Sequence, residues 1–473
     1  MRRVIVVAAA LAILTAFTVA RPQHGFGPSL RDFEAYYSAG ATWAHGDDAY
    51  SVAIWQTEEA LPGVNAERFE VLPFVGPPAT LPLWAAFSFM PYTIAANLWR
   101  VLLFVSLAGL LWILARLAGL ERTPLVLFGL AVAALGFGPI TADLALGQLA
   151  LPVTLAVLCT FAANGALARG CAAVLAFAQP NLALALTGGL RAKKTALPIA
   201  IGAAAFVTVC FVVVRGTGIV NYIRVLYEHG DAERFSAVQL TPAAIAYGFG
   251  ASENAALYVG VFIALVAVIV WLSCARTVRD PLMLFCATSA LVPFVVTFFH
   301  EHDLVIVFAP ALILAARTSG KTSRVALGGA LLCAPNWLGL AQNPDSMLQT
   351  LLLVVAFAAV LVALRQDFSF RTLQIPAAVL ILIGIAGLAA RAHVLPVWPD
   401  AMAALPGGME HAKIAAVWHA EQTATGLFAR DSLWAMLRCA SLAGCGLLAY
   451  AAVLDSVSSR SPVDSRTYSA ARG

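Results

Sequence analysis

Long apolar runs separated by short polar stretches occupy most of this sequence. The first extends from Val4 to Ala20, behind Arg2 and Arg3, and we interpret it as an uncleaved span rather than a signal peptide because so much of the remaining chain is also apolar. Further runs lie at about 75–91, 93–115, 124–141, 149–163, 170–188, 196–214, 255–274, 281–299, 304–316, 325–341, 347–364, 373–392 and 432–454. Because a spanning helix needs roughly 20 apolar residues, the pattern predicts an all-α polytopic membrane protein with about 12–14 transmembrane helices.

Two long polar stretches interrupt this pattern, at 21–74 and 393–431, and a polar tail lies at 455–473. We expect a single transmembrane domain over residues 1–473. Basic residues of the second half collect in alternate loops, and cytoplasmic loops are the ones that carry excess Lys and Arg. On this basis the two long stretches are extracytoplasmic loops and the tail is cytoplasmic.

Composition agrees with a membrane protein and argues against several classes of function. Of 473 residues 61% are hydrophobic and 11% are charged, which is too few charges for a soluble surface of this size. The net charge of +4 is small and its basic residues are scattered, so no nucleic-acid partner is expected. The eight cysteines show neither metal-site spacing nor a disulfide framework. Nucleotide-hydrolysis, dinucleotide-binding and zinc-protease motifs are absent from the sequence.

The stretch from Asp32 to Tyr50 holds the first carboxylates of the chain and predicts a short helix. Ser29 is its expected N-cap, and Gly46 its expected stop. On such a helix Asp32 and Tyr36 share one face, with Tyr37 on the adjacent face. An acid beside aromatic rings indicates a reactive site, while the alternative is a capping box with Ser29 that serves only the helix.

Acidic and aromatic residues alternate through the whole of the first polar loop, 21–74. Aromatic faces stack on the apolar faces of sugars and carboxylates accept their hydroxyl hydrogens, so this composition suits a carbohydrate or headgroup site. A solvated loop with an interfacial aromatic belt is the alternative. In the second loop, the segment from Met409 to Gln422 predicts an interfacial helix with Ile414, Val417 and Trp418 toward lipid.

Four polar residues from His300 to Asp303 stand together at a predicted membrane edge, where charges are retained mainly for function or for pairing with one another. Neighbouring residues on a helix point about 100° apart. Four neighbours on a helix therefore cannot all bind one ion without other partners, and no metal site is expected here.

Several motifs resemble those of glycosyltransferase family 87, polytopic enzymes of the GT-C type. They are Asp32-Phe-x-x-Tyr-Tyr-x-Ala-Gly40, Gly46-Asp-Asp-Ala-Tyr50, Gly76-Pro77-Pro78, Asn97-Leu98-Trp99-Arg100 and Gly147-Gln148-Leu149, in that order. The resemblance covers roughly the first 190 residues well, and the remaining residues resemble the family mainly in their hydropathy pattern. It implies a GT-C-type fold and a glycosyltransferase of the plasma (inner) membrane, with its active site on the extracytoplasmic face.

For the reaction, the resemblance implies that a hexose, with mannose as the first expectation, moves with inversion from a polyprenyl-phosphate donor to an envelope glycolipid or glycan. The matching residue for the family's base is Asp32, with Asp47 and Asp48 as the next candidates. We expect His300 and His302 to bind the donor phosphate, since an imidazole can donate to an oxyanion. Three further residues complete the expected donor site: Tyr36, Tyr37 and Gln148. No cofactor is expected beyond the lipid-linked donor, which is a substrate.

The sequence departs from the family pattern at Gln179-Pro180-Asn181, where relatives tend to have a lysine before the proline. The lost cation puts mannose in doubt as the sugar. Two other functions stay open from the sequence: a transporter or flippase of lipid-linked envelope components, and an inactive relative that acts as an assembly partner. Ionisable clusters at the predicted outer edge, rather than at the midplane, favour the enzyme over the transporter.

Overall fold

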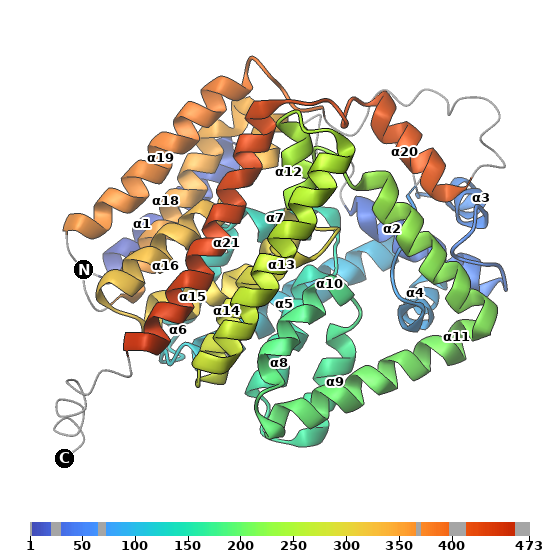
Figure 1. The fold of residues 1–473 in the computed structure, drawn as a ribbon, viewed down its shortest axis with the longest axis horizontal. Coiled ribbons are helices and arrows are strands. Elements are labelled where there is room, and N and C mark those ends of the chain that lie inside the picture. The colour runs from blue at the N-terminus through green and yellow to red at the C-terminus, as the bar shows by residue number, and fades with distance from the viewer. Residues whose placement is uncertain (1, 20–29, 65–71, 366–369, 397–412, 459–473) are drawn as a thin grey trace.

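The computed structural model describes residues 2–19, 30–64, 72–365, 370–396 and 413–458. The described residues are 80% helical and form no strand. The helices assemble side by side into one bundle, with α1, α18 and α19 at one edge and α2, α3, α4 and α11 at the other (Figure 1). The fold is therefore all-α, as the sequence predicts.

The helices, with four short 3₁₀ segments labelled η, succeed one another along the chain. They are α1 (Arg2–Val19), α2 (Arg31–Ala44), α3 (Ala53–Ala60), η1 (Pro78–Thr80), α4 (Leu81–Ser88), α5 (Tyr92–Leu117), α6 (Pro124–Leu135), α7 (Gly138–Leu146), α8 (Ala150–Ala162), α9 (Ala166–Ala176), α10 (Pro180–Ala183), η2 (Leu184–Gly189), α11 (Lys193–Glu233), α12 (Pro242–Gly248), α13 (Glu253–Thr277), α14 (Pro281–Val295), η3 (His302–Leu304), α15 (Val305–Arg317), α16 (Gly320–Cys333), α17 (Trp337–Gln342), η4 (Pro344–Ser346), α18 (Met347–Leu364), α19 (Phe370–Ala390), α20 (Ile414–Ala424) and α21 (Ser432–Ser458).

Six helices in the described ranges are long and apolar enough to cross a membrane, or seven if the pair α6 and α7, bent by 74°, counts as one span. This is fewer than the 12–14 spans expected from the sequence. Several of the predicted runs form helices of 11 to 15 residues instead, such as α8, α9 and α14. At 1.5 Å per residue these reach only about 16–23 Å, short of a hydrocarbon core of about 30 Å.

Burial separates an inner group of helices from an outer ring. Helix α15 is fully buried from Val305 to Ala315, so it is surrounded by protein. Helix α13, by contrast, exposes large apolar side chains such as Phe262 and Leu265. An apolar outer surface of this kind is the face that a multi-pass protein presents to lipid.

Both polar loops predicted from the sequence contain helices. The first holds α2 and α3, and α2 ends before Gly46, whose φ of +90° suits glycine and stops the helix as expected. The second holds α20, but its orientation differs from the prediction. Ile414, Val417 and Trp418 are buried against protein rather than turned to lipid, because an amphipathic pattern cannot distinguish a protein partner from a bilayer.

Helix α11 extends further than its apolar run. The expected loop from 215 onward is helical up to Glu233, with one break at Arg215, whose φ is +56°. The chain changes direction sharply there, as the bend in α11 at the edge of the molecule shows (Figure 1). Its second half returns toward α2 and brings Glu233 beside α20.

Candidate functional site

Asp32 lies in the first turn of α2 and is held by a residue from another element. Its Oδ2 accepts a hydrogen bond of 2.6 Å from Nε2 of Gln148, and its Oδ1 accepts one of 3.3 Å from Arg31. The N-cap residue of α2 is Leu30, in the left-handed region with φ +66°, and it makes no side-chain cap bond. Ser29, the expected cap, lies outside the described residues. The side-chain bonds of Asp32 thus go to Arg31 and to a distant amide, Gln148.

A tight turn after α7 positions Gln148. Gly147 has φ +77°, and its carbonyl accepts a hydrogen bond of 2.8 Å from Nε1 of Trp99. A Cβ on Gly147 would lie 3.0 to 3.2 Å from Leu30 and Phe33, so the turn packs directly on the start of α2. The motifs that contain Trp99 and Gly147-Gln148 therefore meet beside the first turn of α2, next to Asp32.

Tyr36 completes a hydrogen-bonded chain with Gln148 and Asp32. Its hydroxyl donates to Oε1 of Gln148 at 2.6 Å, while its ring stacks on Trp84 with centroids 4.8 Å apart. Burial, and then the nearby charges of Asp32, Asp143 and Asp303, raise the pKa of Tyr36 well above its usual value. The phenol therefore stays protonated and acts as a donor, which fixes the amide of Gln148 with its NH₂ toward Asp32.

Three other predicted residues lie outside this chain of contacts. Tyr37 is buried among aromatic rings and donates to the carbonyl of Met90 at 2.7 Å, which is a packing role. Asp47 is exposed. Asp48 accepts from the backbone N–H of Tyr50 and from Asn221, and so stabilises a local turn.

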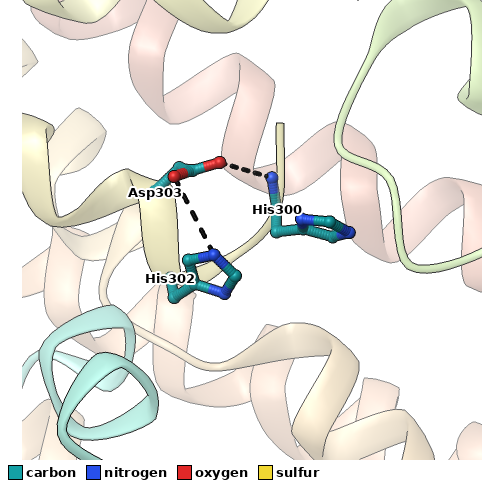
Figure 2. A group of neighbouring side chains, drawn as sticks. All are labelled: His300, His302 and Asp303. Atoms are coloured by element: carbon teal, nitrogen blue, oxygen red, sulfur yellow. Dashed lines mark hydrogen bonds and ion pairs between the residues drawn. The ribbon is translucent and has the colours of Figure 1, made fainter. Parts of the chain in front are cut away.

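The predicted His300–Asp303 cluster occupies a non-helical segment and the short helix η3, between α14 and α15. Asp303 accepts from the backbone N–H of His300 at 2.9 Å, and His302 Nε2 lies 3.9 Å from Asp303 Oδ1 (Figure 2). Glu301 points elsewhere and accepts from the backbone N–H groups of Trp337 and Leu338, at the start of α17. The segment is thus anchored at Glu301, while the two histidines and Asp303 converge.

Gln179 and Asn181, where the sequence departs from the family pattern, contact this cluster directly. Nε2 of Gln179 donates to Asp303 Oδ1 at 2.6 Å, and Asn181 donates to Oδ2 at 3.3 Å. Burial raises the pKa of Asp303 to about 6, although His300 and these amides favour the carboxylate. Two neutral donors therefore stand beside Asp303 where a lysine would have brought a charge.

Glu233, at the end of α11, organises a buried network that the sequence did not reveal. Its Oε2 accepts from Gln239 at 2.6 Å, and its Oε1 accepts from Gln422 at 2.8 Å and from the indole N–H of Trp418. His300 Nε2 lies 3.3 Å from Glu233 Oε2. Burial disfavours the imidazolium, yet the hydrogen bond and charge of Glu233 outweigh it and raise the pKa of His300.

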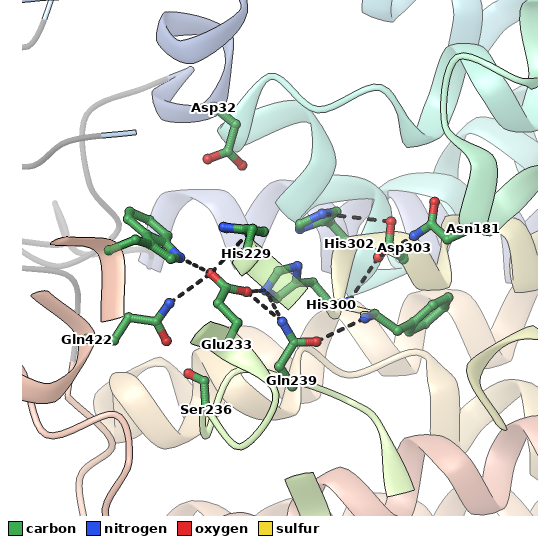
Figure 3. A network of polar contacts seen from close by, with 12 residues as sticks. Asp32, Asn181, His229, Glu233, Ser236, Gln239, His300, His302, Asp303 and Gln422 are labelled. Carbon is green, nitrogen blue, oxygen red and sulfur yellow. Dashed lines mark hydrogen bonds and ion pairs between the residues drawn. The ribbon is translucent and has the colours of Figure 1, made fainter. Parts of the chain in front are cut away.

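The Asp32 chain and the histidine cluster face one another. Figure 3 shows the Asp32 carboxylate turned toward the region of His229, His300 and His302. The guanidinium of Arg31 lies 5.7 Å from the centre of the Trp418 ring, and Trp418 in turn binds Glu233. Helix α20 thereby links the start of α2 to the carboxylate that pairs with His300.

One group in the described part of the chain has metal-binding geometry. Single ligand atoms from His300, His302 and Asp303 all lie within 4.8 Å of one another. The sequence-based expectation was that four neighbours on a helix cannot all bind one ion without other partners. Here Glu301 points elsewhere and His300 precedes η3 in a non-helical conformation, and the expectation of no metal stays a prediction. Taken together, the site offers a carboxylate, two imidazoles and several amide donors, which can remove a proton and bind an anion.

Sequence reasoning placed Asp32, Tyr36, Gln148, His300 and His302 among the candidates, and the structure brings them into two facing groups. Four supporting residues were not predicted from the sequence: Glu233, Gln239, Trp418 and Gln422. The only signal for Glu233 was its place in the polar stretch after an apolar run, which gave no reason to choose it over its charged neighbours.

Comparison with known proteins gives one match. Residues 74–299 match the model of glycosyltransferase family 87. The matched segment includes Gln148, Gln179 and Glu233, begins after Asp32 and ends one residue before His300. No curated protein and no solved structure matches the chain.

Proposed function

We propose, from the match of residues 74–299 to the model of glycosyltransferase family 87, that this chain transfers a hexose, in the first instance mannose, from a polyprenyl phosphate to an envelope glycolipid or glycan. The observation that carries the proposal is the pair of facing groups. Asp32 is held by Gln148 on one side, and the Glu233-paired His300 stands with His302 on the other. A carboxylate opposite two imidazoles suits a single displacement at a sugar carbon.

Asp32 is the general base in this mechanism. The acceptor oxygen forms a bond to the anomeric carbon while its proton passes to the Asp32 carboxylate. The bond from that carbon to the phosphate oxygen breaks, and its electron pair leaves with the polyprenyl phosphate. Attack on the face opposite the leaving group inverts the configuration. Gln148 and Tyr36 orient the carboxylate, because each hydrogen bond of 2.6 Å fixes the next group in the chain.

His300 and His302 bind the donor phosphate. Glu233 favours the charged form of His300, and an imidazolium is a better partner for an oxyanion than a neutral ring. Phosphate is a good leaving group once its charge is stabilised, so the protein needs no separate general acid. Tyr37, Asp47 and Asp48 take no part in this step, given their contacts elsewhere.

The amides of Gln179 and Asn181 bear on the choice of sugar. They hold Asp303 without neutralising it, and so the donor site carries less positive charge than one with lysine at that position. A hexose other than mannose is compatible with this change. The proposed location is the plasma membrane with the site on the extracytoplasmic face, where lipid-linked donors replace nucleotide sugars.

The test is sugar transfer in vesicles that contain the purified protein, a panel of polyprenyl-phosphate sugars and host lipid extract as acceptor. The wild type is compared with Asp32→Asn and with Asp47→Asn, an exposed carboxylate of the same loop. We expect Asp32→Asn to lower the rate by about 10³-fold or more, in the range for loss of a general base, and Asp47→Asn to stay within about threefold.

Transfer by Asp32→Asn at the wild-type rate would remove Asp32 as the base. If no donor supports transfer by the wild type, while an acceptor-free assay also detects no donor hydrolysis or binding, the glycosyltransferase proposal fails in favour of a transporter or an inactive relative.

A further inference from the structure

The proposed reaction uses His300 and His302 at the donor phosphate and gives Asp303 no role, yet the three residues together form a compact set of ligand atoms. One atom from each lies within 4.8 Å of the other two, so a small inward shift of side chains would bring all three to one ion. Two imidazoles and a carboxylate are the ligand set of catalytic zinc sites, which leave a fourth position open. These residues come from one short segment whose backbone Glu301 anchors at α17.

Neighbouring side chains already orient these ligands in the way that outer groups orient metal ligands. Nε2 of His300 faces Glu233 at 3.3 Å. With an ion bound, His300 is neutral: its proton stays on Nε2 toward Glu233, and Nδ1 binds the ion through its lone pair. The amide nitrogen of Gln239 also lies close to His300 Nε2, and this nitrogen donates a hydrogen bond of 2.6 Å to Glu233. The Asp303 oxygens are directed by Gln179, Asn181 and the His300 backbone.

Two independent observations point to a cation. Asp303 is a buried carboxylate with no Lys or Arg of the described residues in an ion pair, and its histidine partner, His302, lies 3.9 Å away. Oε1 of Gln179 is also buried without a hydrogen-bond partner in this part of the chain, on the amide whose nitrogen binds Asp303. Buried charges are normally paired or bound to metal, and buried acceptors normally find a donor. A hydrated metal ion would supply both needs.

We propose that His300, His302 and Asp303 bind one divalent transition-metal ion of the zinc class, whose open position receives an oxygen of the donor phosphate. Until the donor binds, a water at this open position donates to Oε1 of Gln179. The phosphate oxygen then replaces the water, and the ion stabilises the charge of the leaving phosphate. The part of the proposal that concerns the phosphate rests on the proposed function. The binding of the ion does not.

Metal content of the purified full-length protein tests the proposal directly. The protein is isolated in detergent without a histidine tag, stripped with a chelator and dialysed against Zn²⁺, and the bound metal is measured by mass spectrometry. We expect one ion per chain. Replacing Zn²⁺ by Co²⁺ gives a visible absorption spectrum that reports nitrogen and oxygen ligands without any mutation.

Matched variants locate the ion. His302→Ala and Asp303→Asn are expected to weaken Zn²⁺ binding at least tenfold. Glu233→Gln is expected to weaken it by about 10- to 100-fold, because Glu233 orients the ligand His300. The control is His393→Ala, which removes a histidine that is 60% exposed and pairs with Asp431. It is expected to bind like the wild type.

The proposal is overturned if the wild type retains no stoichiometric Zn²⁺ and shows no Co²⁺ spectrum, or if His302→Ala and His393→Ala bind equally. Should a variant fail to fold, the Co²⁺ spectrum of the wild type still decides. A stoichiometric ion without sugar transfer would keep the metal site and count against the glycosyltransferase proposal. Transfer by chelator-treated, metal-free protein would keep the glycosyltransferase proposal and overturn the role of the ion at the donor phosphate.

Discussion

Gln148 uses both ends of its amide at the candidate site, and each end depends on the other. The oxygen accepts from Tyr36 and the nitrogen donates to Asp32. An amide side chain can act in this way because it carries a donor and an acceptor on one planar group. The protonated phenol of Tyr36 selects the orientation of the Gln148 amide, and through it the direction of the Asp32 carboxylate.

A change of this one side chain should therefore affect the rate more than the stability. In Gln148→Glu the nitrogen that donates to Asp32 becomes an oxygen, which repels the carboxylate and loses the bond. We expect kcat to fall by about 10²-fold, the size of effect that misplacement of a catalytic group produces, with little change in KM for the donor. The assay is initial-rate transfer in vesicles.

The matched control is Tyr37→Phe, which removes a hydroxyl whose hydrogen bond goes to the Met90 carbonyl. It should change kcat by less than about threefold while lowering stability by roughly 1 kcal/mol, the net worth of a neutral hydrogen bond. Equal losses of kcat in the two variants would mean that Gln148 acts through general packing.

At the scale of single residues, the sequence predicted part of the candidate site. The i, i+4 spacing of a helix placed Asp32 and Tyr36 on one face and Tyr37 on another, and the structure has the same arrangement. It could not supply Gln148 as the partner of Asp32 or Glu233 as the partner of His300. Those contacts join residues 116 and 67 positions apart (300 − 233 = 67), and no local periodicity encodes such distances.

Among the elements, the turn between α7 and α8 places two requirements on a single glycine. Gly147 ends α7 in the left-handed region, and its missing side chain lets Leu30 and Phe33 approach. The same glycine offers its carbonyl to Trp99. The glycine thus combines a backbone conformation with a close contact between α2 and α7, and both are needed to hold Gln148 against Asp32.

Gly147→Ala should separate these two effects when it is compared with Gly119→Ala. Gly119 has a similar φ of +72° but open space around its Cβ position. We expect Gly119→Ala to cost about 1 kcal/mol for backbone strain alone and to keep activity. Gly147→Ala adds contacts of 3.0 to 3.2 Å with α2, and it should lower both the melting temperature and the transfer rate further.

Thermal unfolding in detergent and transfer in vesicles measure these two consequences. Identical results for the two variants would show that the contact with α2 has no influence on the site. Helix α20 illustrates the opposite limit of prediction at this scale. Its amphipathic pattern was visible in the sequence, but whether its apolar face meets lipid or α2 and α11 depends on the rest of the fold.

For the molecule as a whole, hydropathy predicted the class of fold, and it predicted more spans than the six or seven helices of the described ranges that are long and apolar enough to cross a membrane. Apolar runs such as 281–299 and 304–316 consist of helices that are buried in protein, so they need not match the bilayer thickness. A sliding average of hydropathy cannot separate an inner helix from a lipid-facing one, because both are apolar all round.

The proposed orientation predicts which surface residues a membrane-impermeant thiol reagent reaches in intact cells. Cysteine introduced by Asp47→Cys, at an exposed position after α2, should react from outside. Lys321→Cys, exposed at the start of α16, should react only after the cells are permeabilised. Both changes are made in a background without Cys171, the native cysteine that is exposed.

Labelling with the sides exchanged would reverse the orientation and place the candidate site in the cytoplasm, where nucleotide sugars are available. Labelling of both positions from one side would instead contradict the alternation of loops on which the topology rests.

The enclosure of α15 has a consequence for how the protein would tolerate different bilayers. A thinner or thicker membrane tilts and strains the helices that contact it, and here those are outer helices such as α13 and α19. Helix α15 follows η3, which holds His302 and Asp303, and it is buried in protein from Val305 to Ala315. Hydrophobic mismatch should consequently be absorbed by the outer helices, leaving the spacing between Asp32 and the histidines nearly independent of lipid chain length.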